Sequence, residues 1–240
     1  MESLTRKLEV KEQLNHCLTS YRDSGLNECV QQTETRILSK KIKFPLLEFC
    51  GETFFHEIKS EEQIAFCAQI EKLKTIGGNV IIGIILQKRL HLDLEESIGK
   101  AAEFISLADA WYICDIIGER VFGYALLNSW DQAFPLIKDL AEHPSNWVVR
   151  SLGAGFHNAI KNGLEKNRVE PLFLVLLSKA NVKDKEMKQG MGWAAKTTAK
   201  FHPDLISKFR SEIESTEKTG AWFRTKVRIG LERHQYAKGN

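Results

Sequence analysis

The sequence lacks the segments that mark membrane-spanning, secreted and disulfide-rich proteins. No part of it has the roughly 18 uninterrupted apolar residues that a spanning helix needs, and the apolar stretch Gly77–Leu86 is far too short. Residues Met1–Gln13 alternate charged and single apolar residues, so they lack the apolar run of a signal peptide. The 5 cysteines are odd in number and scattered, with no Cys-x-x-Cys or Cys/His metal spacing. We therefore expect a cytoplasmic protein with reduced cysteines, no bound metal and no membrane.

Common catalytic signatures are missing as well. The sequence has no glycine-rich phosphate loop, no Gly-x-Ser-x-Gly and no His-Glu-x-x-His. Its histidines are isolated, and we expect six of them on the surface or at helix ends: His56, His91, His143, His157, His202 and His234. A net charge of +3 is too small to indicate an anionic partner by itself. The sequence predicts no cofactor, so any reaction has to come from residues outside these motifs.

Proline is scarce, and its scarcity favours long helices. Between the 5 prolines and the glycine breakers, segments of about 12–20 residues place apolar side chains at helical spacing. Ser60 followed by Gln63 predicts a capping box that starts a helix over 61–75. Paired helical segments recur loosely along the chain: Ser60–Leu90, Asp93–Leu127, Ser129–Lys161, Glu170–Phe201 and Pro203–Arg233. The pattern predicts one all-α domain over residues 1–240, built of stacked antiparallel HEAT-like helix pairs, with 1–26 as an N-terminal helical arm.

Trp111 and Asp115 lie one helical turn apart in the middle of the chain. Side chains at positions i and i+4 project from one helix face about 40° apart, so this face carries an indole ring and a carboxylate. Both groups suit a cationic ligand. A later segment also places an indole near a cation, Trp193 with Lys196. These residues are therefore the first candidates for a functional site.

Three sequence blocks carry a resemblance to a known family. They are Ala110-Trp111-Tyr112-Ile113-Cys114-Asp115, Asn146-Trp147-Val148-Val149-Arg150, and Met187–Asp204, in which a Met-Gly-Trp helix is ended by a Pro-Asp turn. From about Glu61 to Arg233, the chain resembles the AlkD-type HEAT-like-repeat DNA alkylation repair glycosylases. The resemblance implies a right-handed solenoid, or superhelix, whose concave face binds duplex DNA.

The resemblance also implies roles for five residues. Trp111, Asp115 and Trp193 match the family's catalytic residues, whereas Arg150 and Lys196 match residues that hold the DNA backbone. A purine alkylated at N3 or N7 is cationic and already a good leaving group, so a catalyst has mainly to stabilise a sugar of oxocarbenium character. A carboxylate and two electron-rich ring faces supply that stabilisation. The implied activity is that of a DNA glycosylase, which hydrolyses the N-glycosidic bond of such purines in duplex DNA.

Further basic residues are candidate phosphate contacts, because binding a duplex demands several of them. One cluster of lysines and arginines precedes Phe44, and another lies near the C-terminus. From these clusters and from the last block, the DNA-binding candidates are Lys43, Lys188, Arg224 and Arg228. The expected partner is duplex DNA containing alkylated bases, bound by a monomer.

Two other functions remain open from the sequence. A non-catalytic protein of the same fold would bind damaged or branched DNA without cleaving it. A protein-interaction solenoid would instead use Trp111 and Trp193 in its core, where large rings are usually buried.

Overall fold

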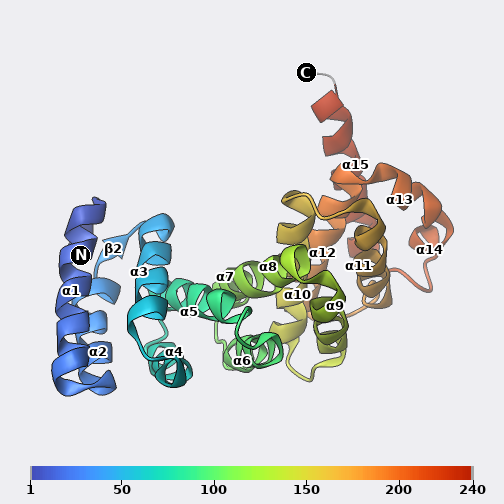
Figure 1. Ribbon diagram of the computed structural model, residues 1–240. Coiled ribbons are helices and arrows are strands. Elements are labelled where there is room, and N and C mark those ends of the chain that lie inside the picture. Colours follow the sequence, from blue (N-terminus) through green and yellow to red (C-terminus); the bar gives the residue numbers. More distant parts are fainter. Residues whose placement is uncertain (1, 239–240) are drawn as a thin grey trace. The chain divides into compact units, whose positions relative to one another are not determined.

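The computed structural model describes residues 2–238, with side chains described as far as His234, and consists almost entirely of helices (Figure 1). The chain forms two compact units, one up to Asp93 and one from Leu94 onward. The prediction of an all-α protein is confirmed. The predicted single domain includes residues 1, 239 and 240, which lie outside the described part of the chain, and it stays a prediction.

The first unit combines helices with two very short strands. Its elements are β1 (Ser3–Leu4), α1 (Lys7–Ser24), α2 (Leu26–Thr33), the π-helical turn η1 (Glu34–Leu38), β2 (Lys41–Ile42), α3 (Phe44–Glu57), the 3₁₀ turn η2 (Ser60–Glu62), α4 (Gln63–Lys72) and α5 (Ile76–Arg89). The two strands pair in parallel, with Ser3 opposite Lys41. Strands of two residues are too short to show the alternating pattern by which a sequence predicts them.

Helix α1 is packed into the first unit through an apolar face. Val10, Leu14 and Cys17 recur at helical spacing and are buried, and the helix contacts α2 and α3. Gly25 ends α1 with a φ of 84°, a left-handed value that favours glycine. A helix is therefore present within the predicted N-terminal arm, and its apolar face belongs to the core of the unit.

The predicted capping box at Ser60 is wrong. Ser60 begins a 3₁₀ turn, and the α-helix begins at Gln63 without a side-chain hydrogen bond at its N-cap. The side-chain Nε2 of Gln63 donates to the carbonyl oxygen of Ile58 (3.1 Å), and its side-chain Oε1 accepts from Nη1 of Arg89 (3.0 Å). Because Arg89 is buried and needs polar partners, Gln63 bonds to it rather than to the start of the helix.

The second unit contains the remaining helices. Its elements are α6 (Leu94–Ser106), α7 (Trp111–Gly118), the π-helical turn η3 (Glu119–Gly123), α8 (Tyr124–Asn128), α9 (Trp130–Asp139), the 3₁₀ turn η4 (Leu140–Glu142), α10 (Asn146–Lys161), α11 (Lys166–Ser178), α12 (Lys185–Phe201), α13 (Pro203–Lys208), α14 (Arg210–Glu214) and α15 (Ala221–Lys238). Of the helical pairs predicted after residue 92, Ser129–Lys161 and Glu170–Phe201 each hold two α-helices, whereas Asp93–Leu127 and Pro203–Arg233 each hold three.

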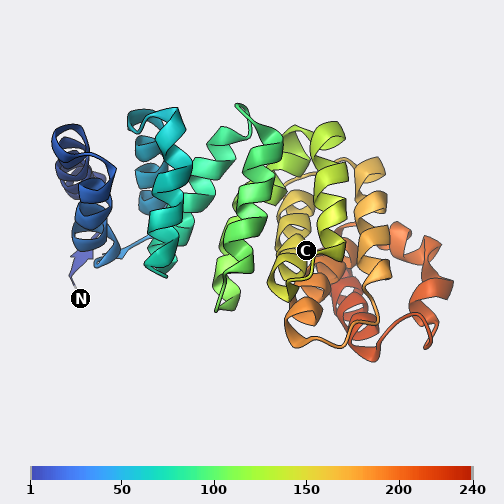
Figure 2. The same cartoon turned by 90° about the horizontal axis from the view of Figure 1, so that it is seen from below.

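Helices α7, α10, α12 and α15 of the second unit lie side by side. Helix α10 packs between α7 and α12, and α12 packs between α10 and α15 (Figures 1 and 2). One face of α10 is apolar and buried, through residues such as Val149, Leu152 and Phe156. A separate face carries Arg150 and His157, which are seven residues apart and thus within about 20° of each other around the axis. This polar face of α10 is where the candidate site begins.

Glycines allow these helices to approach closely. A Cβ added at Gly153 of α10 would lie 2.0 Å from the carbonyl oxygen of Gly190 in α12, and one added at Gly190 would lie 2.2 Å from the carbonyl oxygen of Arg150. Gly118 of α7 faces Ser151 of α10 in the same way, at 2.6 Å. Any larger residue would push the helices apart, so the glycines hold α7, α10 and α12 in backbone contact.

The described residues hold no helix with both the length and the apolar content that crossing a membrane requires. The same residues contain no group of three or more His, Cys, Asp or Glu side chains placed to hold a metal ion. The cysteines are buried free thiols, and burial raises the pKa of Cys114, beside Asp115, to about 12. A thiol of such a high pKa is a poor nucleophile, so Cys114 packs rather than reacts.

Candidate functional site

Trp111 and Asp115 stand on one face of α7, as their spacing predicts. Trp111 is the first residue of the helix, and 57% of it is exposed, which is unusual for so large a ring. Asp115 lies one turn later, and only 14% of its side chain is exposed. The face therefore offers an open indole ring beside a largely buried carboxylate.

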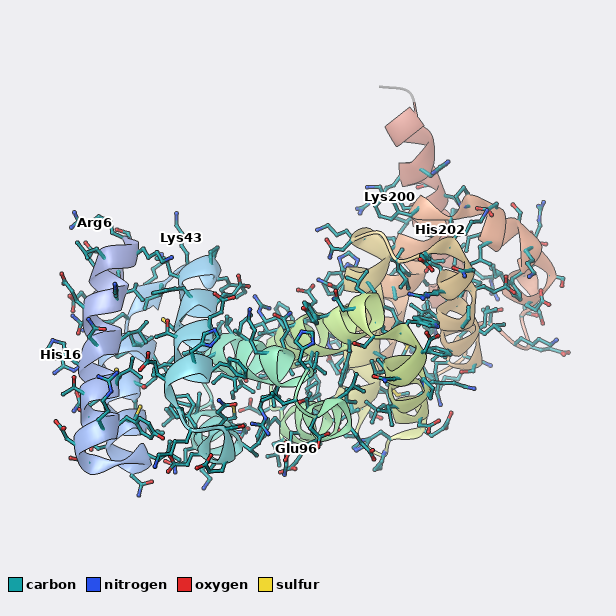
Figure 3. All side chains as sticks on the ribbon, in the orientation of Figure 1. Arg6, His16, Lys43, Glu96, Lys200 and His202 are labelled. Carbon is teal, nitrogen blue, oxygen red and sulfur yellow. The ribbon has the colours of Figure 1, made fainter. Side chains whose placement is uncertain are left out.

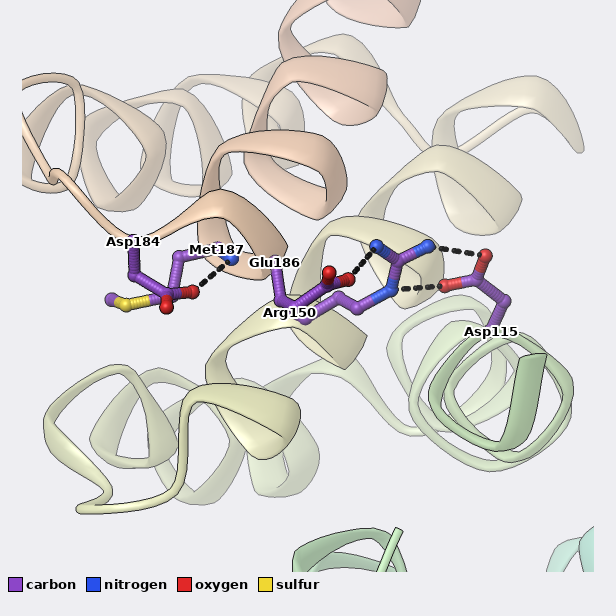
Figure 4. A network of polar contacts seen from close by, with 5 residues as sticks. All are labelled: Asp115, Arg150, Asp184, Glu186 and Met187. Carbon is purple, nitrogen blue, oxygen red and sulfur yellow. Dashed lines mark hydrogen bonds and ion pairs between the residues drawn. The ribbon is translucent and has the colours of Figure 1, made fainter. Parts of the chain in front are cut away.

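Arg150 of α10 holds the carboxylate of Asp115 in a two-pronged ion pair (Figure 4). Its Nε donates to Oδ1 at 3.1 Å and its Nη2 to Oδ2 at 2.9 Å. Such a fork fixes both oxygens at once, because guanidinium and carboxylate groups match in geometry. The guanidinium carbon of Arg150 also lies 5.8 Å from the centre of the Trp111 ring. One arginine thus contacts both predicted residues of α7.

The remaining nitrogen of Arg150 bonds to a third helix. Its Nη1 donates to Oε2 of Glu186 at 2.9 Å. Glu186 is held at the start of α12, where Asp184 caps the helix by accepting from the backbone N–H of Met187 (2.9 Å, Figure 4). With both carboxylates ionised, the cluster of Asp115, Arg150 and Glu186 carries one net negative charge.

The carboxylates of this region are poorly solvated. Burial raises the pKa of Asp115 above its ordinary value, although the hydrogen bond and charge of Arg150 act in the opposite direction. Burial likewise raises the pKa of Glu119, one turn beyond Asp115. A carboxylate with little water around it gains more from an approaching cation than a carboxylate in bulk water does. Chemically, the arrangement can therefore stabilise a positive charge placed beside it.

Trp193 lies on the same face of α12 as Glu186, seven residues later. Its ring is half-buried and stacks on the imidazole of His157, with ring centroids 4.1 Å apart and planes 26° apart. His157 stands seven residues after Arg150 on the polar face of α10. That face of α10 therefore contacts Asp115 and Glu186 through Arg150, and it contacts Trp193 through His157. Arg150 and His157 lie about 10 Å apart along the helix axis.

The expectation for His157 is wrong, because this histidine lies neither on the open surface nor at a helix end. It is half-buried within α10, and its Nδ1 lies 2.7 Å from Oγ1 of Thr197. Burial, together with the charges of Lys161 and Lys196, lowers the pKa of His157 to about 4. The ring is therefore neutral at neutral pH.

Lys196 belongs to a group of cations beside Trp193. Burial and the positive charges of Arg233 and Lys226 lower the pKa of Lys196. Lys226 reaches α12 from α15, since its Cγ would lie 2.9 Å from a Cβ added at Gly192. Three cations from α12 and α15 therefore gather on one side of these helices, and such a cluster suits a phosphate backbone.

The other predicted DNA-binding residues lie elsewhere. Arg224 and Arg228 line a groove with α13 and α14, and Arg228 is about 160° around α15 from Lys226. Lys188 is half-buried on α12. Lys43 is exposed just before α3, in the first unit (Figure 3). The structure does not bring Arg224 and Arg228 to the side of α15 that faces Lys196.

A comparison with protein families adds to this geometry. The family model of the DNA alkylation repair enzymes matches residues 42–224, which is more than half of the chain. The chain belongs to the DNA alkylation repair enzyme family. No curated protein and no solved structure matches it. The family places the protein among enzymes of DNA repair and makes DNA the expected partner, and the matched span includes Trp111, Asp115, Arg150 and Trp193.

Glu186 and His157 are residues of the site that the sequence did not reveal. Glu186 precedes the block Met187–Asp204 by one position, and His157 follows Arg150 by two helical turns. The spacing of His157 from Arg150 is a signal in retrospect, because seven residues return to the same helix face. Nothing local distinguishes Glu186 from the other acidic residues that favour helix starts.

Proposed function

We propose that this DNA repair enzyme is a glycosylase that hydrolyses the N-glycosidic bond of cationic N3- or N7-alkylated purines in duplex DNA. The observation that carries the proposal is the contact set of Arg150, which joins the exposed ring of Trp111 to the oriented carboxylate of Asp115. An open indole next to a poorly solvated carboxylate is suited to a cationic sugar and base. The family match supports repair of alkylated DNA as the setting.

The proposed reaction needs stabilisation of charge more than it needs acid catalysis. As the bond to the alkylated purine lengthens, positive charge moves from the base onto the sugar. The carboxylate of Asp115 stabilises that charge and orients the attacking water, and the rings of Trp111 and Trp193 face the sugar. Arg150 keeps the two oxygens of Asp115 in place before the lesion arrives, which lowers the cost of reorganisation during the reaction.

The proposed partner is duplex DNA, bound through its phosphates. Lys196 is the best-supported contact, because Lys226 and Arg233 lie near it and Trp193 precedes it by one turn. Lys43, Lys188, Arg224 and Arg228 stay predicted contacts. A phosphate contact by Arg150 also stays a prediction, although its guanidinium is held by two carboxylates in the structure. We further propose that the helix pairs of the second unit are HEAT-like repeats of a right-handed superhelix with DNA on its concave side.

The oligomeric state and the cellular location stay predictions from the sequence. We expect a monomer in the cytoplasm that uses no cofactor and no metal.

A second candidate function is binding of damaged or branched DNA without cleavage. The ion pair between Asp115 and Arg150 favours it, because a carboxylate engaged by a buried guanidinium has part of its charge already neutralised. Under this alternative the pair supports the packing of α7 on α10, and Trp111 stacks on unpaired bases.

Release of free alkylpurine from methylated duplex DNA separates the two functions. We expect wild-type protein to release N3- and N7-methylpurines above the spontaneous rate and Asp115→Asn to lose most of that activity. Asp139→Asn, at the exposed end of α9, is the matched control and keeps full activity. Thermal unfolding of both variants checks that they fold. If wild-type protein binds the duplex but releases no base, the non-catalytic function is correct.

A further inference from the structure

The imidazole of His157 covers one face of the indole ring of Trp193, a proposed catalytic residue. It stacks on Trp193 across the contact between α10 and α12, with centroids 4.1 Å apart. A ring stacked on one indole face leaves only the opposite face and the edges of Trp193 for a ligand. His157 therefore limits how the indole can turn and which of its faces meets a ligand.

Thr197 fixes the orientation of that imidazole. Its hydroxyl oxygen lies 3.0 Å from the carbonyl oxygen of Trp193, to which it can donate. The same hydroxyl oxygen of Thr197 lies 2.7 Å from Nδ1 of His157, within hydrogen-bond distance. These bonds tie His157 to the helical turn that carries Trp193.

The charge state of His157 also matters to Trp193. Lys161 of α10 and Lys196 of α12 are the charged groups that act on the imidazole, and both disfavour its protonation. A protonated imidazole against the indole would compete with any other cation for the electrons of that ring. The neutral imidazole leaves the indole free to attract a cationic ligand on its open face.

We propose that His157 is a positioning residue, which holds the indole of Trp193 in the orientation that meets the sugar of the lesion. The proposal rests on the proposed glycosylase function. It makes α10 the supporting helix for both of its neighbours, with Arg150 orienting Asp115 of α7 and His157 orienting Trp193 of α12.

Single-turnover excision of 7-methylguanine from a duplex tests this role. We expect His157→Ala to lower the rate about tenfold without changing duplex affinity, and His157→Phe to keep most of the rate, because its ring still stacks. His234→Ala, a half-buried histidine bonded to the carbonyl oxygen of Lys200, is the control and keeps the wild-type rate. In a Trp193→Ala background, His157→Ala should cause no further loss, since the two residues act as a unit.

Two kinetic results would overturn the proposal. One is a rate for His157→Ala within about twofold of wild type. The other is a loss of the same size in the Trp193→Ala background, which would show that His157 acts on stability or on another residue.

Tryptophan fluorescence tests the pairing without any need for activity. We expect His157→Ala to change the emission of the otherwise wild-type chain and to leave that of a Trp193→Phe chain unchanged. An unchanged emission in the first comparison contradicts the pairing. If wild-type protein releases no alkylpurine, the proposed function fails, whereas this comparison still decides whether His157 orients Trp193.

Discussion

Arg150 uses two nitrogens to hold both oxygens of Asp115, at 3.1 and 2.9 Å, and its third nitrogen to hold Glu186. The fork orients the carboxylate of Asp115 but also offsets its charge. Glu186 restores one net negative charge to the cluster. The balance of these three groups is therefore the feature by which the site would favour a cation.

Glu186→Gln removes one negative charge and keeps an acceptor for Arg150. We expect the net charge of the cluster to become zero and the preference of the site for a cation to fall about fivefold, ~1 kcal/mol. The measurement compares the affinities for two duplexes, one with a cationic pyrrolidine and one with an uncharged tetrahydrofuran in place of the sugar. Glu170→Gln, which loses an exposed ion pair to Lys208, is the control. An unchanged ratio of the two affinities would contradict a role for the charge of Glu186.

Gly190→Ala inserts a methyl group where α10 and α12 touch. Its Cβ would lie 2.2 Å from the carbonyl oxygen of Arg150, so we expect the free energy of unfolding to fall by about 3 kcal/mol or more. Gly99→Ala in the exposed part of α6 meets nothing within 4 Å and should instead stabilise by roughly 0.5–1 kcal/mol. Urea unfolding of both variants checks the pair, and equal effects would show that the helices are not in contact here.

Glu119→Gln should raise stability at neutral pH. Burial raises the pKa of Glu119 in the folded protein above its unfolded value, so the folded state binds the proton more tightly. Ionisation of Glu119 therefore lowers the free energy of unfolding as pH rises from the unfolded-state pKa through the folded-state pKa, and the loss persists at higher pH. Gln removes the cost, so we expect the variant to be more stable than wild type at pH 7. Below the ordinary glutamate pKa of about 4.3, the advantage should disappear. Thermal unfolding against pH measures the difference, and an advantage that is constant with pH would contradict this cause.

Lys226→Ala should weaken duplex binding more than Arg228→Ala does. Lys226 faces α12 and lies near Lys196, whereas Arg228 is paired with Glu232 on the other side of α15. Losing one phosphate contact should reduce the slope of log affinity against log salt by about one. Affinity measured over a range of salt concentrations gives both slopes. A larger change for Arg228→Ala would place the DNA on the groove side of α15.

The parts of the fold and site that the sequence predicts are those that depend on neighbours in the chain. Helical spacing predicts the helix pairs, and an i, i+4 relation places Trp111 and Asp115 on one face. The pairing of Arg150 with Asp115 and Glu186 joins residues 35 and 36 positions apart, and that of His157 with Thr197 joins residues 40 apart. Such contacts depend on which helices pack together and on the axial register between them.

The glycine contacts explain why that axial register could not be predicted from the sequence. Gly153 against Gly190 fixes α10 on α12, and a shift of either helix by one turn would give Arg150 other partners. A glycine within a helical pattern predicts only a local loss of stability unless the facing helix is known. The capping box predicted at Ser60 is absent for a similar reason, because the side chain of Gln63 accepts a hydrogen bond from Arg89, a buried residue of the next helix.

Excision of a single 7-methylguanine from a defined duplex, measured under single-turnover conditions with wild-type protein and Asp115→Asn, tests the central claim most directly. We expect wild-type protein to release the base well above the spontaneous rate and the variant to be slower by about 10²-fold or more, with duplex affinity retained. Release by the variant within about twofold of wild type, or no enzymatic release by either, would contradict the account.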